Sequence, residues 1–464
     1  MSMLRAQVTD RINAAVSRAD TTRTVIIDSR AIARAPSCFA ECFGGGTAVI
    51  IADKNTYSAA GKAVMEAFTS NGRTTVHRPL IIEDGDLCAD YRFVDKIDAY
   101  LRSIDAIPVA VGSGTINDLV KLSAHHCDRP YMVVATAASM DGYTAFGASI
   151  TKDGYKQTMT CPAPTALIAD MEVIENAPDG MNASGYADLI AKIPAGADWI
   201  VADALGIEPI HQEAWSLVQS DLRVRIENPA GIRNKDGNSL LMLMEGLIMS
   251  GLAMQVAQSS RPASGAEHQF SHLWDMEHHV HDGIAPSHGT KVGIGSICSE
   301  ALYELALDLT SEEIQFASDH VGEWWEDWPA IEAEIRDSFK DAAVVEEVVE
   351  QSRAKYVDAA TLSKRLHLLR YIWIDLKAAL REQLLGARTI QAMIQSAGAP
   401  SLPEEIGIDR ARLSDSYTRA RMFRKRYTVL DLALECGAWR KCQDSLFGPG
   451  GFWNPVNSQD DARS

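Results

Sequence analysis

Residues 107–121, IPVAVGSGTINDLVK, contain the pattern that decides the fold. An apolar run typical of a buried strand leads into Gly112-Ser113-Gly114, and a helical pattern follows with Thr115 as its expected N-cap. Glycines let the backbone approach a ligand closely, and the free N–H groups of a first helical turn attract a pyrophosphate. Because the spacing is not GxGxxG, a plain tight turn remains the alternative to a dinucleotide site.

The same alternation of strand and helix extends on both sides of this stretch. Strand-like runs occupy residues 22–28, 47–53, 75–82, 107–114, 131–139 and 164–170. Helical patterns occupy residues 31–42, 56–70, 91–103 and 115–125, and a β-hairpin is expected through residues 151–155. Apolar strands separated by helices predict a parallel sheet covered on both faces, with ligands bound at the carboxyl ends of the strands. Beyond about residue 181 the pattern is helical, so we predict an α/β domain over 1–180 and an all-α domain over 181–464.

The composition excludes some classes of protein. The formal net charge of −18 over 464 residues argues against a nucleic-acid binder, so an anionic ligand needs a local pocket. Eight cysteines without a CxxC pair favour a reducing cytoplasm, and no secretory signal is expected at the N-terminus. The only membrane-length apolar run, residues 240–257, contains Glu245 and Gln255, which favours a buried core helix over a membrane span.

Histidines concentrate in residues 265–295, which hold six of the twelve in the chain. His268 and His272 are four apart, hence on one face of a helix, and His288 begins the next apolar run. Imidazole is the commonest ligand for divalent transition metals, and three protein ligands with one open position are usual in catalytic sites. Three further histidines are better explained as surface or helix-end residues: His278, His279 and His281.

Two carboxylates stand out elsewhere. Asp188 lies between apolar neighbours in the helical pattern of residues 182–192, where burial is costly unless a cation or donors meet the charge. A bound metal ion would neutralise the charge of Asp188. Asp53 ends the strand at 47–53, where it either accepts the ribose hydroxyls of NAD or simply caps the next helix.

Five motifs together resemble the iron-containing alcohol dehydrogenase and dehydroquinate synthase-like superfamily, and within it the sn-glycerol-1-phosphate dehydrogenases. The motifs are Gly112-Ser113-Gly114-x3-Asp118-x2-Lys121, TAASMDG at 136–142, SGYADLIAK at 184–192, GAEHQFSH at 265–272 and HGTKVG at 288–293. They appear in the family's order over roughly residues 22–300. The chain departs from the family in its Gly-Ser-Gly turn, where Gly-Gly-Gly is commoner, and in an acidic helical extension after about residue 310.

The resemblance implies a fold and a set of site residues. It predicts a Rossmann-like N-terminal domain and a helical C-terminal domain, with the active site in the cleft between them. It implies one zinc, nickel or ferrous ion held by Asp188, His268 and His288, with His272 as a proton relay or a structural neighbour. The other implied residues are Asp53, Gly112, Ser113, Gly114, Asp118, Thr136 and Ser139 for the cofactor, and Asp141 and Lys192 for the substrate.

The implied reaction is NAD(P)H-dependent reduction of dihydroxyacetone phosphate to sn-glycerol 1-phosphate, a step of phospholipid metabolism. Lys192 or Lys291 is a candidate for the substrate's phosphate, a solvated lysine being the alternative. Three rival hypotheses remain: a glycerol dehydrogenase, a dehydroquinate synthase-type lyase, and a metal that only ties two domains together. The expected partners are a small phosphorylated substrate and further copies of the chain, with no nucleic acid and no membrane span. Trp324, Trp325 and Trp328 are the candidate contact between copies.

Overall fold

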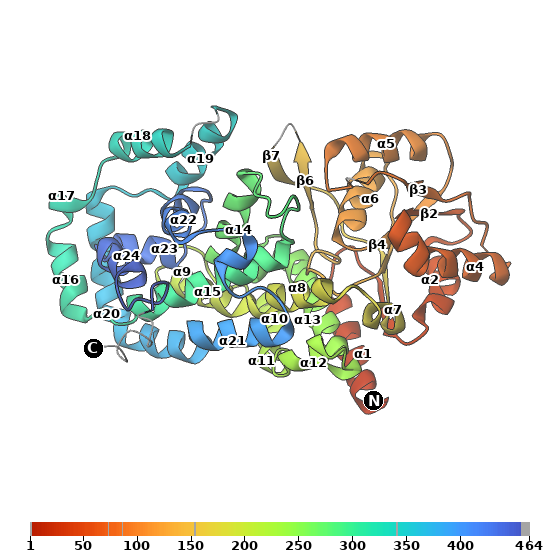
Figure 1. The fold of residues 1–464 in the computed structure, drawn as a ribbon, viewed down its shortest axis with the longest axis horizontal. Helices are drawn as coiled ribbons and strands as arrows, with labels where there is room; N and C mark the ends of the chain where they lie inside the picture. The colour runs from red at the N-terminus through yellow and green to blue at the C-terminus, as the bar shows by residue number, and fades with distance from the viewer. Residues whose placement is uncertain (1, 73, 86, 153–154, 340–341, 456–464) are drawn as a thin grey trace, which may run out of the picture.

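A six-stranded parallel sheet forms the core of the N-terminal part, as Figure 1 shows on its right-hand side. The structure is a computed structural model and describes residues 2–72, 74–85, 87–152, 155–339 and 342–455. The sheet has the order β1-β8-β5-β4-β2-β3. Its strands are β1 (Thr24–Asp28), β2 (Ala48–Asp53), β3 (Leu80–Ile82), β4 (Ile107–Gly112), β5 (Met132–Ala135) and β8 (Ala166–Asp170). The predicted parallel α/β sheet is confirmed.

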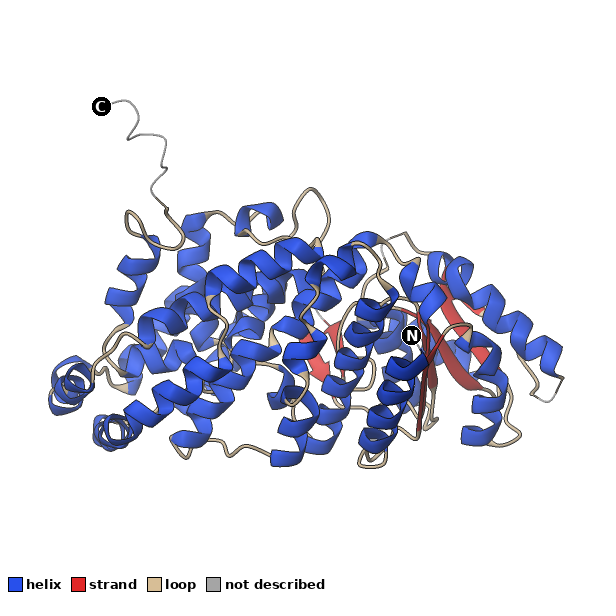
Figure 2. Ribbon diagram, turned by 90° about the horizontal axis from the view of Figure 1, so that it is seen from below, coloured by secondary structure: helices blue, strands red, loops and turns tan. Residues whose placement is uncertain are grey.

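Helices cover both faces of the sheet (Figure 2). Alternate side chains of each strand point to opposite faces, so Ile50 of β2 packs with Phe39 and Phe68 on one face while Ile51 packs with Phe93 on the other. The first face is covered by the 3-10 turn η1 (Ala31–Arg34), α2 (Ala35–Phe43), α3 (Lys54–Thr56), the π-helical turn η2 (Tyr57–Gly61) and α4 (Lys62–Asn71). The second is covered by α5 (Tyr91–Arg102) and α6 (Gly114–His126).

Local details differ from the sequence predictions. The strand expected at 75–82 is regular only over β3, because Pro79 lacks the N–H that a ladder needs; Val76 makes a single bridge to Ala48. Thr115 is not the N-cap of α6, since the helix begins one residue earlier and Ser113 holds the cap position without a side-chain bond. The expected hairpin is present as the antiparallel pair β6 (Ala148–Lys152) and β7 (Tyr155–Met159). Its turn at 153–154 lies outside the described residues.

The rest of the chain is helical. After α7 (Met171–Glu175) come α8 (Asp179–Ile190), α9 (Lys192–Ala204), α10 (Gln212–Gln219), α11 (Leu222–Arg225), α12 (Pro229–Arg233), α13 (Gly237–Ala257), η3 (Arg261–Ala263), α14 (Ala266–Met276) and α15 (His288–Ala306). The extension comprises α16 (Ser311–Asp319), α17 (Val321–Trp324), α18 (Trp328–Ser338), α19 (Ala342–Lys355), α20 (Ala359–Gln383), α21 (Ala387–Ala397), η4 (Pro403–Ile406), α22 (Arg410–Met422), α23 (Val429–Glu435) and α24 (Trp439–Phe447). We propose a domain boundary near residue 180, where the last strand and α7 give way to α8.

α13 is the one described helix long and apolar enough to cross a membrane, and 83% of its most apolar window is buried inside the protein. Glu245, in the middle of this helix, is fully buried and pairs with two arginines. Arg11 of the N-terminal helix α1 (Ser2–Val16) lies 2.6 Å away and Arg225 lies 3.4 Å away. These ion pairs offset the desolvation of the Glu245 carboxylate, so α13 is the core helix that the sequence predicts.

Candidate active site

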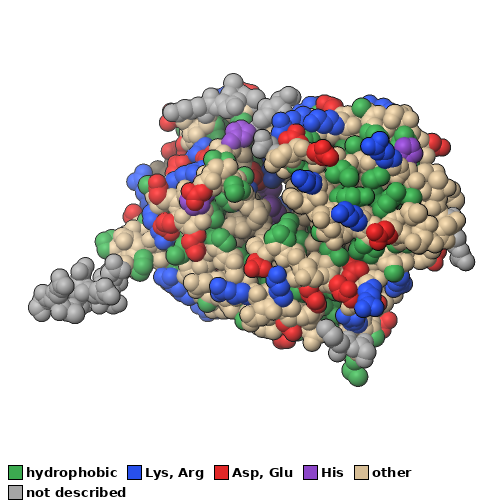
Figure 3. All heavy atoms as spheres, turned by 45° about the vertical axis from the view of Figure 1, so that its right-hand side comes forward, with side chains coloured by type: hydrophobic (Ala, Val, Ile, Leu, Met, Phe, Trp, Pro, Cys, Tyr) green, Lys and Arg blue, Asp and Glu red, His purple; other side chains and the backbone are tan. Residues whose placement is uncertain are grey.

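A cleft of about 1610 Å³ lies between the sheet and the helical part. Its lining combines the turn after β4, the loop 139–142, the β6–β7 hairpin, and residues of α8, α14 and α15. In the space-filling view the surface is hollowed here, with histidine side chains inside (Figure 3). A pocket for one small molecule typically measures roughly 300–1000 Å³, so this cleft has room for a dinucleotide and a substrate together.

Asp188, His268 and His288 converge at the helical wall of this cleft, where both histidines are in the described lining and Asp188 is fully buried behind it. One ligand atom from each lies within 4.8 Å of the other two. Nε2 of His268 is 3.8 Å from Oδ1 of Asp188, and the two imidazole rings are 5.3 Å apart between centroids. The side chains come from three different helices, α8, α14 and α15, so tertiary packing alone brings them together.

Two glycines allow those helices to approach so closely. A Cβ at Gly185 would lie 1.8 Å from the carbonyl oxygen of Ala138, in the loop after β5. A Cβ at Gly289 would lie 2.0 Å from the carbonyl oxygen of Ser184, so α15 meets α8 through its backbone. Any larger residue at either position would push a ligand-bearing helix out of place.

The side chains around His268 fix its orientation. Oε1 of Glu267 lies 2.8 Å from Nδ1 of His268 and also accepts the N–H of Gly265. A carboxylate at Nδ1 holds the imidazole in the tautomer whose Nε2 is free to bind a metal. Asp198 of α9 accepts the N–H of Ala266 at 2.7 Å, which anchors the first turn of α14. The sequence analysis missed both carboxylates; Glu267 could have been found as the acidic neighbour of a candidate ligand.

Each oxygen of Asp188 already has a donor. Nζ of Lys192 lies 2.8 Å from Oδ1, and the N–H of Asp141 donates to Oδ2 at 3.0 Å. The same ammonium lies 2.8 Å from Oδ2 of Asp141. Burial alone would lower the pKa of Lys192, but the charges of Asp141 and Asp188 outweigh burial and raise it above its usual value. The side chain of Lys192 is fully buried between two carboxylates and is absent from the described cleft lining, so its role toward a substrate phosphate stays a prediction.

The predicted cofactor residues divide into two groups. Ser113, Gly114, Asp118 and Ser139 line the cleft, and so does the predicted substrate residue Asp141. Three others are absent from the described lining: Asp53, Gly112 and Thr136. Asp53 instead accepts the N–H groups of Asn55 and Thr56, which is the helix-capping alternative. Its role toward a ribose stays a prediction.

Lys121 supports the wall of the cleft from behind. Its fully buried ammonium donates to the carbonyl oxygens of Gly142, Ala145 and Gly147 at 2.9, 2.9 and 3.1 Å. These bonds hold the loop that follows Asp141. Asp118, 3.8 Å from that ammonium, accepts the N–H of Ser149, and burial raises its pKa. Lys121 thus shapes the cleft through the backbone and has no direct contact with it in the described lining.

His272 and His288 face the same space. Their ring centroids lie 6.2 Å apart, and that of His272 is 6.2 Å from His268. Burial lowers the pKa of His288 well below its usual value, with His268 adding to the effect. Burial also lowers the pKa of His272, and the charge of Arg424 is the next cause. Neutral imidazoles are the form that binds a metal.

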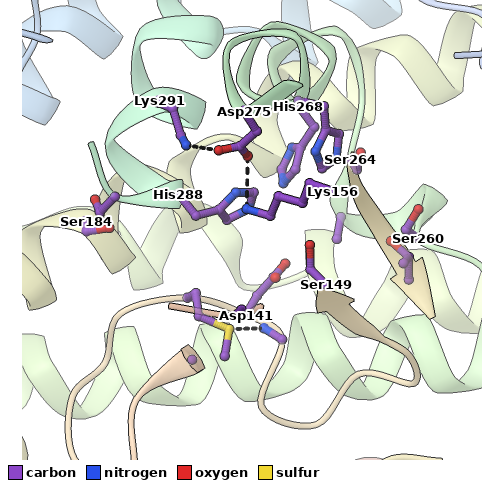
Figure 4. Close-up of a pocket in the computed structure, with 18 of the residues that line it drawn as sticks. Asp141, Ser149, Lys156, Ser184, Ser260, Ser264, His268, Asp275, His288 and Lys291 are labelled. Carbon is purple, nitrogen blue, oxygen red and sulfur yellow. Dashed lines mark hydrogen bonds and ion pairs between the residues drawn. The ribbon is translucent and has the colours of Figure 1, made fainter. Parts of the chain in front are cut away.

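A group of charges near His288 was not predicted. Asp275 of α14 lies between Lys291 of α15 and Lys156 of β7, as Figure 4 shows. Nζ of Lys156 is 3.0 Å from Oδ2 of Asp275. Burial opposes ionisation of Asp275, but the two lysines lower its pKa to about 2. No local sequence pattern brings residues 156 and 275 together, because their contact depends on how the hairpin folds over the cleft.

The remaining histidines of the cluster lie away from the ligands. Nε2 of His279 contacts the carbonyl oxygen of Ile406 at 2.5 Å and its Nδ1 contacts Arg412 at 2.8 Å. His278 is exposed at a left-handed backbone position that ends the helix. His278 thus agrees with the surface or helix-end explanation, whereas His279 is buried and packs against η4 and α22.

Comparison with known proteins decides the family. Residues 24–178 match the model of the iron-containing alcohol dehydrogenase family. A glycerol-1-phosphate dehydrogenase [NAD(P)+] of Bacillus velezensis is 30% identical over 393 residues, which cover 84% of this chain and 86% of the relative. The chain belongs to the glycerol-1-phosphate dehydrogenase family.

Other members and solved structures agree with this assignment. A glycerol-1-phosphate dehydrogenase [NAD(P)+] of Halalkalibacterium halodurans is 36% identical over 257 residues, covering 55% of this chain and 64% of that relative. Among solved structures, glycerol dehydrogenase from Schizosaccharomyces pombe matches with a TM-score of 0.57 at 15% identity, covering 95% of each chain. At that identity the likeness shows the fold alone. The predicted fold, a Rossmann-like domain followed by a helical part, is confirmed and is shared with that glycerol dehydrogenase.

Proposed function

We propose that this protein is a metal-dependent oxidoreductase that transfers hydride from NAD(P)H to the carbonyl carbon of dihydroxyacetone phosphate, giving sn-glycerol 1-phosphate. The observation that carries the proposal is the convergence of Asp188, His268 and His288 in a cleft whose other wall bears the Ser113–Gly114 turn. Relatives with this named activity support it over most of the chain.

The donor set fits one divalent ion. One carboxylate and two imidazoles suit zinc, nickel or ferrous iron, and Glu267 holds His268 with Nε2 directed toward Asp188. Three protein ligands leave a position open for a substrate. When bound, the ion supplies Lewis acidity toward a substrate oxygen.

The chain's own residues bind and orient the reactants. The unbonded N–H groups at the start of α6, together with Ser113 and Gly114, are suited to the cofactor's pyrophosphate. Ser139 and Asp118 line the cleft between that turn and the histidines, where the nicotinamide must meet the substrate. His272, which has no hydrogen bond within the described residues, is our proposed relay for the proton that the new hydroxyl acquires. Lys192 acts as a positioning residue for Asp188.

We further propose a cytoplasmic homo-oligomer. The proposed contact region between protomers contains three tryptophans that are half-buried within one protomer: Trp324, Trp325 and Trp328. Phosphorylated substrate and cofactor are the ligands that this function requires.

NADH oxidation by dihydroxyacetone phosphate tests the function on chelator-treated protein to which zinc, nickel or ferrous iron is restored. Asp188→Asn keeps the side-chain shape but removes the charge, so we expect kcat/KM to fall at least about 100-fold. The matched control is Asp179→Asn on the same helix, whose side chain is 88% exposed and pairs with Lys235. That variant is expected to match wild type.

Turnover of Asp188→Asn at the wild-type rate would refute the ligand assignment. Preference for dihydroxyacetone over its phosphate would instead identify a glycerol dehydrogenase. Turnover of a dehydroquinate precursor without net change in NADH would identify the lyase.

A further inference from the structure

The C-terminal extension returns to the cleft through one basic loop. Residues 423–428, FRKRYT, connect α22 to α23 and follow more than a hundred residues after the last metal-ligand candidate. Arg424 and Arg426 line the cleft together with His268 and His272. The extension therefore contributes to the site that the other helices build.

The loop is held in place by hydrogen bonds of the two residues that follow Arg424. The guanidinium of Arg426 donates to the carbonyl oxygen of Ser264 at 2.7 Å and to Oγ of Ser260 at 2.9 Å. Gln269 of α14 donates to the carbonyl oxygen of Arg426, and Gln351 of α19 accepts the backbone N–H of Lys425 at 3.1 Å. The loop is thus tied to the same helix that carries His268 and His272.

Arg424 itself is not committed to any of these bonds. Throughout the described ranges, no hydrogen bond or ion pair engages its guanidinium, which lies 5.0 Å above the ring of Phe423. That ring is 6.5 Å from the ring of His272. The half-exposed side chain of Arg424 lines the cleft together with His272, so its N–H donors can bind an anion there.

Four lysines near the cleft have partners, whereas Lys425, beside Arg424 in the described lining, is exposed to solvent. Lys192 is buried between two carboxylates, and Lys121 is occupied by three carbonyl oxygens. Lys156 and Lys291 share the carboxylate of Asp275. A phosphate monoester that enters between the histidines and the solvent thus meets Arg424, whose guanidinium donors are not engaged by other described residues.

We propose that Arg424 is the specificity-determining residue that binds the substrate's phosphate group, an inference that rests on the function proposed above. A guanidinium offers two parallel N–H donors that match two phosphate oxygens, a geometry that an ammonium lacks. The cofactor's pyrophosphate is assigned to the opposite wall, at Ser113 and Gly114, so the two phosphate sites lie at different places in one cleft. The extension would then supply discrimination between a phosphorylated and an unphosphorylated ketone.

The test compares wild type with Arg424→Gln and Arg424→Lys. The control is Arg440→Gln on α24, an exposed arginine outside the cleft lining, which removes the same charge from the same region. For Arg424→Gln we expect KM for dihydroxyacetone phosphate to rise roughly 10- to 100-fold while kcat changes less than about 3-fold, because a contact present throughout the reaction affects binding alone. For Arg424→Lys we expect a KM between those of wild type and Arg424→Gln. Calorimetric titration with inorganic phosphate should show the same order of affinities.

If Arg424 only stabilises the fold, the measurements will give a different result. Equal losses of kcat on dihydroxyacetone phosphate and on dihydroxyacetone, with a lower thermal midpoint, would overturn the proposal. So would a KM and a phosphate affinity within about 2-fold of wild type in Arg424→Gln. If Lys156→Gln alone raises KM, the phosphate lies at the hairpin lysine and the proposal is wrong. If wild type does not reduce dihydroxyacetone phosphate, the proposed function fails, and calorimetry alone decides whether Arg424 binds phosphate.

Discussion

At the scale of single residues, the site depends on how a buried carboxylate is kept charged. Asp188 is fully buried, yet Lys192 and the N–H of Asp141 meet both of its oxygens before any ion binds. Lys192 was expected to contact the substrate from its position one turn after Asp188. The same spacing instead directs its ammonium back to the carboxylate, because side chains four apart lie on one helix face.

Replacing Lys192 by methionine should therefore destabilise the protein even without metal. The variant leaves Asp141 and Asp188 buried with no cation between them, and removing one partner of a buried pair typically costs about 3–5 kcal/mol. Urea unfolding of chelator-treated protein measures this loss. Lys62→Met, at an exposed position of α4, is the control. A loss below about 1 kcal/mol would mean that Lys192 does not hold the two carboxylates.

At the scale of elements, α15 links the metal-ligand candidates to the extension. His288 begins the helix, while near its other end Glu300 accepts the N–H groups of Leu385 and Gly386, just before α21. Burial raises the pKa of Glu300 to about 7, although the two N–H groups oppose the shift. The carboxyl of Glu300 is therefore protonated more readily in the folded protein than in the unfolded chain.

This shift predicts a pH dependence with a definite sign. A carboxyl whose pKa is higher in the folded state stabilises the fold fully below its unfolded pKa of 4.5, and that contribution is lost as pH rises through about 7. Wild type should thus lose up to about 3 kcal/mol between pH 5 and pH 8 relative to Glu300→Gln, which cannot ionise. Unfolding free energies at several pH values measure the difference. Glu312→Gln, at an exposed position of α16, controls for the loss of one carboxylate. Equal slopes in wild type and Glu300→Gln would contradict this explanation.

At the scale of the whole molecule, local patterns were predictable and distant contacts were not. Strand and helix periodicity in residues 22–170 predicted the sheet, because a continuous apolar run is typical of a strand that is buried on both faces of a sheet. Chemistry and resemblance together selected Asp188, His268 and His288 as a ligand set, and the fold brings them within 4.8 Å of one another. By contrast, nothing near Glu245 indicates that Arg11 will meet it from the first helix.

The same limit applies to the cleft. Lys156 meets Asp275 only because a hairpin folds over α14, and Arg424 lines the cleft with His272 only because the extension turns back on the helical part. Such contacts depend on the packing of whole elements, which periodicity and spacing do not encode. The segment after residue 310 was therefore recognised as helical but not as part of the cleft wall.

The central claim is that three helices present Asp188, His268 and His288 to one divalent cation. Anomalous X-ray diffraction at the absorption edge of the added metal, on crystals of the reconstituted protein, tests it most directly. The account predicts a single strong peak about 2.0–2.2 Å from a ligand atom of each of the three side chains, and its absence in Asp188→Asn. A peak elsewhere, or none at this position in wild type at full metal loading, would contradict it.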